Sequence, residues 1–240
     1  SEVEIMKYTL YGDGIHDDTA AIQELIDNSC EVVLPEPDKF YLISKPLELH
    51  SDFRLVLPRF AEIRLADASN CVMLKNVTVE DYDKRADFEL FSFLDKYSPD
   101  APCENIRVEG GIWNFNNKAQ SPNPLSVGRY DIPYYSGFGM LFYNVRNLSL
   151  SSMTLKDPVN FAVTLDTVSY FRVENITFDM NDGNPYQNNM DGIHIDGNCH
   201  HGHIEKLYGR CYDDIVALNA HEGSSGPISD ITIKGIYTDK

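Results

Sequence analysis

Basic residues are scarce in this 240-residue chain. It has 20 lysine and arginine residues against 37 aspartate and glutamate residues, so the formal net charge is 20 − 37 = −17. Nucleic acids and anionic membranes both need a basic protein face, so this balance argues against either as a partner. It also slightly disfavours a polyanionic substrate, although a local basic cleft can outweigh the global sign.

Long apolar runs are missing as well. None approaches the roughly 18 residues that span a bilayer. The N-terminal Ser-Glu-Val-Glu-Ile lacks the charged and apolar regions of a signal peptide, which is compatible with a signal that has been removed. Hydrophobic residues still make up 42% of the chain, enough for a core.

Cysteine is sparse, and the five cysteines are scattered (Cys30, Cys71, Cys103, Cys199 and Cys211). An odd number in a chain of this size argues against a disulfide framework. One bridge stays open at this point, with Cys199 and Cys211 as the nearest candidates.

No helix-length pattern separates the strand-like segments, which excludes a doubly wound α/β fold. Instead, alternating apolar positions recur in segments that begin at Ile106, Leu148, Phe171 and Ile231, with a weaker copy at Ile204. The copies at Leu148 and Phe171 are 23 residues apart, and later offsets stretch to about 30. This period predicts stacked coils in a single all-β domain over residues 1–240, a right-handed parallel β-helix.

Residues 17–28 are the exception, because they predict a short helix with Asp17 or Asp18 as N-cap. Its single apolar stripe consists of Ile22, Leu25 and Ile26. A helix with one apolar face is suited to cap the open end of a solenoid, where the core would otherwise be exposed.

Short strands are expected at Glu31–Leu34, Phe40–Ile43, Phe53–Leu57 and Ile63–Leu65. Two loop insertions, over about 76–104 and 114–135, interrupt the regular repeat of strands. Long loops on a rigid scaffold often carry binding residues. Tyr130, with Tyr134 and Tyr135, could stack on sugar rings there or could fold the insertion onto the body.

Three carboxylates, Asp191, Asp213 and Asp214, stand at the starts of two short apolar runs, Ile193–Ile195 and Ile215–Leu218. Asp191 and Asp213 are 22 residues apart, about one coil, so the two runs should stack as neighbouring rungs about 4.8 Å apart. Acids held that close do not all ionise normally, which is the condition for separate acid and base roles. The alternative is that they are turn residues that bond their own backbone.

Other polar residues flank this cluster. Strand alternation predicts that His194 points away from Asp191, while Asn189 and Asn219 are suited to asparagine stacks or to substrate hydroxyls. Residues 199–203, Cys-His-His-Gly-His, contain metal-binding residue types but lack the usual ligand gaps. We therefore expect a polar turn there, and neither a metal site nor a cofactor is predicted.

Several motifs resemble the polygalacturonase family of glycoside hydrolases (family 28), within the pectin-lyase-like β-helix group. Residues 12–23, from Gly-Asp-Gly to Ala-Ile-Gln, resemble the N-terminal capping signature of that group. Residues 189–192, Asn-Met-Asp-Gly, resemble the family's Asn-Thr-Asp-Gly motif, and Asp213–Leu218 resembles its paired-Asp motif.

The resemblance implies a secreted, periplasmic or cell-surface enzyme that hydrolyses a pectin-type or related polysaccharide. It implies that Asp213 is the general acid and that Asp191 and Asp214 activate water in an inverting reaction. Carboxyl groups in such a pair stand about 6.5–9.5 Å apart. The candidate substrate-binding residues are Asn189, His194, Asn219, His221 and Tyr130.

The chain also departs from the family. The Gly-His-Gly and Arg-x-Lys motifs have no match, and His221 does not lie in a Gly-His-Gly context. The polyuronate preference is therefore not carried over, and we expect the solenoid to continue beyond residue 240. Two other functions stay open: a non-catalytic glycan-binding solenoid or adhesin part, and a polysaccharide lyase or epimerase. The lyase ranks lower because few basic residues flank the carboxylates, Lys206 and Arg210 being the nearest.

Overall fold

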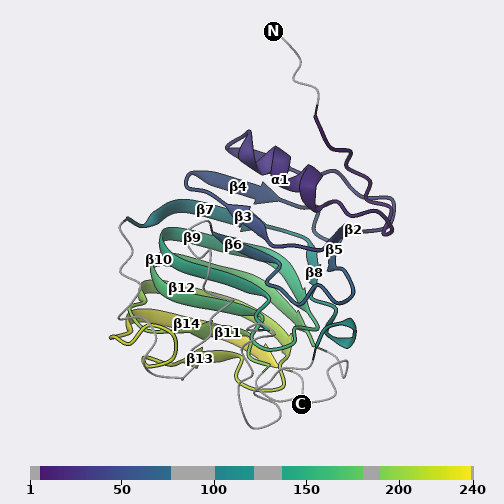
Figure 1. The fold of residues 1–240 in the computed structure, drawn as a ribbon. Coiled ribbons are helices and arrows are strands. Elements are labelled where there is room, and N and C mark those ends of the chain that lie inside the picture. Colours follow the sequence, from purple (N-terminus) through teal and green to yellow (C-terminus); the bar gives the residue numbers. More distant parts are fainter. Residues whose placement is uncertain (1–5, 77–100, 122–136, 181–189, 239–240) are drawn as a thin grey trace.

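The chain folds into a parallel β-helix. The computed structural model describes residues 6–76, 101–121, 137–180 and 190–238. Within these residues successive coils descend in sequence order, and all the strand pairs are parallel (Figure 1). The all-β solenoid predicted from the repeat is confirmed.

Strands from successive coils stack into three faces. Face 1 contains β1 (Glu31–Val33), β4 (Phe53–Val56), β7 (Cys103–Glu109) and the central or first parts of β9 (Met140–Lys156), β10 (Val163–Asp179), β12 (His200–Arg210) and β14 (Ser229–Thr238). Face 2 contains β2 (Tyr41–Ile43), β5 (Glu62–Leu65), β8 (Ile112–Asn114) and the last residues of those four long strands. Face 3 contains β3 (Leu47–Leu49), β6 (Leu74–Asn76), the first residues of β9 and β10, β11 (Ile193–Ile195) and β13 (Val216–Leu218).

The register reproduces the predicted period. Leu148 pairs with Phe171, 23 residues on, whereas Phe171 pairs with Gly202, 31 residues on, and Gly202 with Ile231, 29 residues on. Residues between the pairing positions alternate in and out, so every coil adds apolar side chains to one continuous core. The largest fully buried side chains in that core include Trp113, Phe142 and Phe178.

The helix α1 (Thr19–Asp27) lies across the N-terminal end of the coil stack (Figure 1). Its N-cap is Asp18, one of the two predicted, but the Asp18 carboxylate accepts hydrogen bonds from the N–H groups of Tyr11 and Gly12 and not from the first helical turn. Ile22 and Ile26 are fully buried against the first coils, so the helix covers core that the end of a solenoid would expose. Neither this helix nor any other in the described ranges is long and apolar enough to cross a membrane.

Residues with left-handed backbone form the corners at which a coil turns, including corners inside the long strands. One corner is a column with φ between 55° and 65° in successive coils: Asp52, Asn105, Asn147, Tyr170, His201 and Asp230. Asparagine tolerates this conformation better than most residues. Side-chain amides also link the coils, because Asn105 donates to Asp52 (2.6 Å) and Asn147 donates to Asn105 (2.7 Å).

All five cysteines lie in described segments and are free thiols. The one bridge that the sequence left open, between Cys199 and Cys211, is therefore not formed. Of the two predicted insertions, the first lies almost wholly outside the described residues. The second is described only as far as Ser121 and contains the short 3₁₀ helix η3 (Asn117–Ala119).

Candidate active site

The carboxylate cluster is built where β11 and β13 stack on face 3. Ile193 pairs with Val216, so the register places Asp191 beside Asp214 rather than beside Asp213. Gly192 N–H donates to the Asp214 carbonyl (2.9 Å), and Asp214 N–H donates to Asp191 Oδ1 (3.1 Å). The predicted stacking of the two runs is confirmed. The register differs by one residue from the spacing of 22 between Asp191 and Asp213, because Asp191 lies opposite Asp214.

One oxygen from each of Asp191, Asp213 and Asp214 lies within 4.8 Å of the other two. Asp191 is buried and both its oxygens accept hydrogen bonds, whereas Asp213 and Asp214 are exposed. The sequence therefore brings together one fixed carboxylate and two that a substrate can reach.

The prediction that His194 points away from Asp191 is wrong. Its Nδ1 lies 2.7 Å from Asp191 Oδ2. Strand β11 begins only at Ile193, and the alternation of side chains does not extend back through Gly192 to Asp191. A Cβ at Gly192 would lie 2.6 Å from the Ile215 carbonyl oxygen, so the bend that lets Asp191 reach the histidine needs a glycine.

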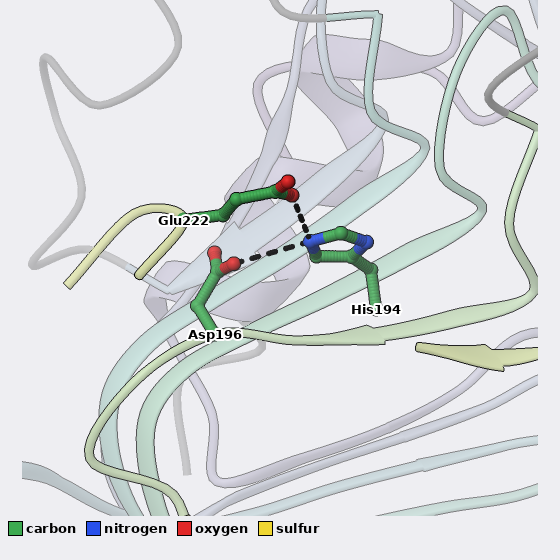
Figure 2. A group of neighbouring side chains, drawn as sticks. All are labelled: His194, Asp196 and Glu222. Carbon is green, nitrogen blue, oxygen red and sulfur yellow. Dashed lines mark ion pairs between the residues drawn. The ribbon is translucent and has the colours of Figure 1, made fainter. Parts of the chain in front are cut away.

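The other ring nitrogen of His194 faces a second group of polar side chains. Nε2 lies 2.9 Å from Glu222 Oε2 and 3.2 Å from Asp196 Oδ1 (Figure 2). Asn219 Nδ2 donates to Glu222 Oε2 (3.2 Å) and lies 3.4 Å from the same Nε2. The ring of Phe161 stacks on the imidazole at 3.7 Å and 5°, which fixes the plane of a side chain only 1% exposed.

These contacts shift the ionisation of the buried groups. Burial lowers the pKa of His194, but hydrogen bonds with Asp191, Asp196 and Glu222 raise that pKa well above 6.5. Burial raises the pKa of Asp196 to about 7, although the hydrogen bond with His194 opposes the rise. The hydrogen bond with His194 lowers the pKa of Glu222, although burial opposes it. The carboxylates around His194 thus favour a positive charge on its ring.

The remaining predicted residues are less closely involved. Asn189 and Tyr130 lie outside the described residues. His221 is exposed, and its Nδ1 lies 3.1 Å from Ser225 Oγ. Asn219 does join the cluster, through Glu222 and His194.

Sequence reasoning missed Asp196, Glu222 and Phe161. Asp196 has a recognisable signal, because it follows His194 by two residues and so lies on the same face of an extended segment. Glu222 has none, since its position depends on the path of the chain after β13.

The segment from Cys199 to His203 is not the polar turn that was expected. Most of it forms the start of β12, with His201 at the corner column. Its histidines take separate partners, Ser229 for His200, Asp230 for His201 and Glu205 for His203. Cys199 is buried, with its Sγ next to the backbone of Leu165 and Val168.

Comparison with protein-family models gives no match for this sequence, and comparison with curated proteins gives none either. Solved structures do match. A putative glycosyl hydrolase from Parabacteroides merdae has a TM-score of 0.64 at 15% identity, covering 95% of this chain and 92% of that one. A polygalacturonase from Erwinia carotovora has a TM-score of 0.63 at 18% identity, covering 94% of this chain and 60% of that one. The Streptococcus pneumoniae surface adhesin PfbA has a TM-score of 0.60 at 20% identity, covering 95% and 59%.

Identities this low establish the fold alone. The chain shares the parallel β-helix fold with a putative glycosyl hydrolase, a polygalacturonase and an adhesin, and it spans about three fifths of the length of the polygalacturonase and of PfbA. A fold does not determine a function, so the function must be argued from the site.

Proposed function

We propose that this protein hydrolyses glycosidic bonds of a polysaccharide by carboxylate acid/base chemistry, with inversion. The observation that carries the proposal is the convergence of Asp191, Asp213 and Asp214 within 4.8 Å, two of them exposed, on neighbouring rungs of face 3. The fold shared with a polygalacturonase and a putative glycosyl hydrolase supports it.

In this proposal Asp213 protonates the glycosidic oxygen as it leaves, and Asp214 with Asp191 orients the attacking water on the opposite face of the sugar. Asp191 positions Asp214 for this role, because it accepts a hydrogen bond from the Asp214 N–H and its own carboxylate is held by His194. An inverting pair needs carboxyl groups about 6.5–9.5 Å apart to admit the water. The proposal therefore requires the carboxyl groups to separate as the sugar enters, at a place where Asp213 and Asp214 both lie on the surface.

The proposed substrate is a pectin-type or related glycan, met outside the cell or in the periplasm. In this proposal Asn219 and His221, which follow β13, contact sugar hydroxyls, and Asn189 and Tyr130 are candidates for the same task. A net charge of −17 agrees with a partner that is neither a nucleic acid nor an anionic membrane.

A second candidate is a glycan-binding surface without turnover, which the similarity to the adhesin PfbA favours. The carboxylates would then accept hydrogen bonds from sugar hydroxyls, and no water would be activated. A lyase or epimerase needs a strong base, and the basic residue nearest to Asp213 in the sequence, Arg210, has its guanidinium over the Tyr212 ring.

The test is a panel of polysaccharides (polygalacturonate, rhamnogalacturonan and neutral galactans) assayed for new reducing ends and for unsaturated products. Wild type, Asp213→Asn and the control Asp230→Asn are compared, because Asp230 is also exposed but lies on a corner of the next coil. We expect saturated reducing ends with inverted anomeric configuration, reduced at least about a hundredfold in Asp213→Asn and unchanged in Asp230→Asn.

Unsaturated ends would assign the protein to the lyases. Sugar binding without any turnover would identify the cluster as a recognition surface and refute hydrolysis.

A further inference from the structure

The Nε2 side of His194 is a separate feature from the exposed pair Asp213 and Asp214. Three segments meet there: His194 from β11, Asp196 from the residues that follow β11, and Glu222 from the loop after β13 (Figure 2). The donor atoms Nε2, one Asp196 oxygen and one Glu222 oxygen lie within 4.8 Å of one another. A nitrogen and two carboxylate oxygens are thus directed at one point from two successive coils.

The distances match the edges of a metal coordination sphere. Ligands bound at about 2.0–2.2 Å to one ion stand about 2.9–3.5 Å apart in octahedral or tetrahedral geometry. Nε2 lies 2.9 Å from Glu222 Oε2 and 3.2 Å from Asp196 Oδ1, both within that range. One ion can therefore replace the proton between these atoms with little movement of the side chains.

The far side of the imidazole is arranged as in a metal-ligating histidine. Such a histidine almost always gives its other N–H to a carboxylate or carbonyl, which fixes the tautomer and leaves the remaining nitrogen for the metal. Asp191 Oδ2 accepts from Nδ1 at 2.7 Å, and Phe161 holds the ring plane by stacking. Nε2 is thereby oriented towards Asp196 and Glu222.

The surrounding backbone is shaped around the carboxylates. Gly223 has a φ of +62°, and a Cβ there would lie 2.4 Å from Asp166 Oδ2 and 2.5 Å from Asp196 Oδ2, so the loop bearing Glu222 approaches closely only with glycine at this position. Thr164 pairs with His194 in register on the same face, and its hydroxyl is fully buried with no hydrogen-bond partner. That hydroxyl can hold a water in the coordination sphere of an ion.

We propose that His194 Nε2, Asp196 and Glu222 bind a first-row divalent cation of the Zn²⁺ type, with water in the remaining positions. Imidazole and carboxylate together suit such an ion better than Ca²⁺, which prefers oxygen ligands alone. The ion cross-links the coil of β11 to the coil of β13, and the partly exposed Glu222 leaves a path for its entry. The proposal does not depend on whether Asp213 and Asp214 are catalytic.

The test is direct metal binding. The protein is analysed for metal content, dialysed against EDTA, and titrated with ZnCl₂, MnCl₂ and CaCl₂ by isothermal calorimetry. We expect about one Zn²⁺ per chain, weaker Mn²⁺ binding and no comparable Ca²⁺ binding. Glu222→Gln should weaken Zn²⁺ binding by at least about tenfold, and Glu222→Asp, which keeps the charge but shortens the reach, by less.

His203→Gln is the matched control. His203 forms another histidine–carboxylate pair, with Glu205 at 3.3 Å, but Glu205 also pairs with Lys234 and the histidine is partly exposed. The control should bind Zn²⁺ like wild type. Circular dichroism and urea unfolding check that the Glu222 variants fold, which is expected because the Glu222 side chain is partly exposed. Co²⁺ bound at the site should give visible absorption that is lost in Glu222→Gln.

Two results would overturn the proposal. Zn²⁺ binding that persists in Glu222→Gln would place the ion outside this group, and binding that disappears in His203→Gln would place it on the surface histidines. No binding at all would mean that His194 is held as an imidazolium by the three carboxylates.

Discussion

Among single residues, Gly192 determines how the carboxylate cluster forms. It lets Asp191 bend back to His194 while its own N–H bonds to the next coil. The space beside its Cα is filled by the Ile215 carbonyl and by the ring of Phe178, at 2.6 and 2.8 Å from where a Cβ would lie. An alanine there must displace backbone, not a flexible side chain.

We expect Gly192→Ala to lower the free energy of unfolding by about 2 kcal/mol or more, since overpacking against fixed atoms typically costs about 1–3 kcal/mol. Urea denaturation measures the loss. Gly235→Ala is the control, because Gly235 has a φ of +69° but no neighbour closer than 3.4 Å. It should lose only about 1 kcal/mol, from backbone strain. Equal losses would mean that the close contact at Gly192 is not what matters.

At the scale of elements, the corner column shows how polar side chains join the coils. Asn147 occupies a left-handed position, donates to Asn105 one coil earlier and lies in register with Tyr170 one coil later. Asn147 therefore stabilises the fold in two ways: it tolerates the left-handed backbone conformation, and its side-chain amide forms a hydrogen bond to the preceding coil.

Substitutions at Asn147 separate these effects. Asn147→Gly keeps the backbone conformation and loses only the side-chain hydrogen bond, worth about 1 kcal/mol. Asn147→Ala loses the bond and adds the strain of a left-handed alanine, a further cost of about 1 kcal/mol. We expect alanine to be the more destabilising in urea denaturation. A glycine variant less stable than the alanine variant would contradict this account.

The end of α1 depends on His50 in the following coil. Its Nε2 donates to the carbonyls of Ile26 (2.9 Å) and Ser29 (3.1 Å), and its Nδ1 donates to the carbonyl of Ser51 (2.8 Å). Both ring nitrogens can donate only in the imidazolium form. Burial lowers the pKa of His50, but these backbone hydrogen bonds raise it above 6.5 overall.

The sign of the pH dependence follows from the raised pKa. The stabilisation is complete below about pH 6.5, the unfolded value, and is lost as the pH rises through the higher value of the folded state. His50→Gln should therefore cost about 1 kcal/mol more at about pH 5.5 than at about pH 8.5, as expected for a cation at a helix C-terminus. Urea denaturation of both proteins at the two pH values measures the difference. A larger cost at the higher pH would refute the imidazolium assignment.

The elements differ in how far the sequence determines them. The rungs in β9, β10 and β14 could be predicted because their apolar alternation repeats every coil. The three-residue strands β3 and β6 on face 3 were not predicted, although the equally short β1 and β2 were. A run so short carries almost no period, so its own sequence decides little. Their partners in neighbouring coils, not their own sequence, make them strands.

The candidate site divides in the same way. Stacking of Asp191 on Asp214 follows from coil length alone and was predictable to within one residue. The His194 contact was mispredicted because extended alternation fails at Gly192, and Glu222 was missed because a loop path decides its position.

At the scale of the whole molecule, the dominant property is a net charge of −17 on a folded solenoid. Like charges held on one compact surface repel, and unfolding moves them apart. The described surface ion pairs, such as Arg54 with Glu31 and with Glu109, each contribute only about 0–1 kcal/mol. General repulsion should therefore outweigh the exposed pairs.

Added salt should consequently stabilise the protein. Raising NaCl from about 10 mM to about 150 mM shortens the screening length from about 30 Å to about 8 Å, which weakens repulsion across the surface. We expect the midpoint of thermal unfolding to rise by a few degrees over this range, measured by calorimetry at a pH near 7, and KCl to act like NaCl because the effect is screening and not ion binding. If the midpoint fell with salt, attractive ion pairs would control the stability of the folded chain, and the acidic surface would be compensated locally along each coil.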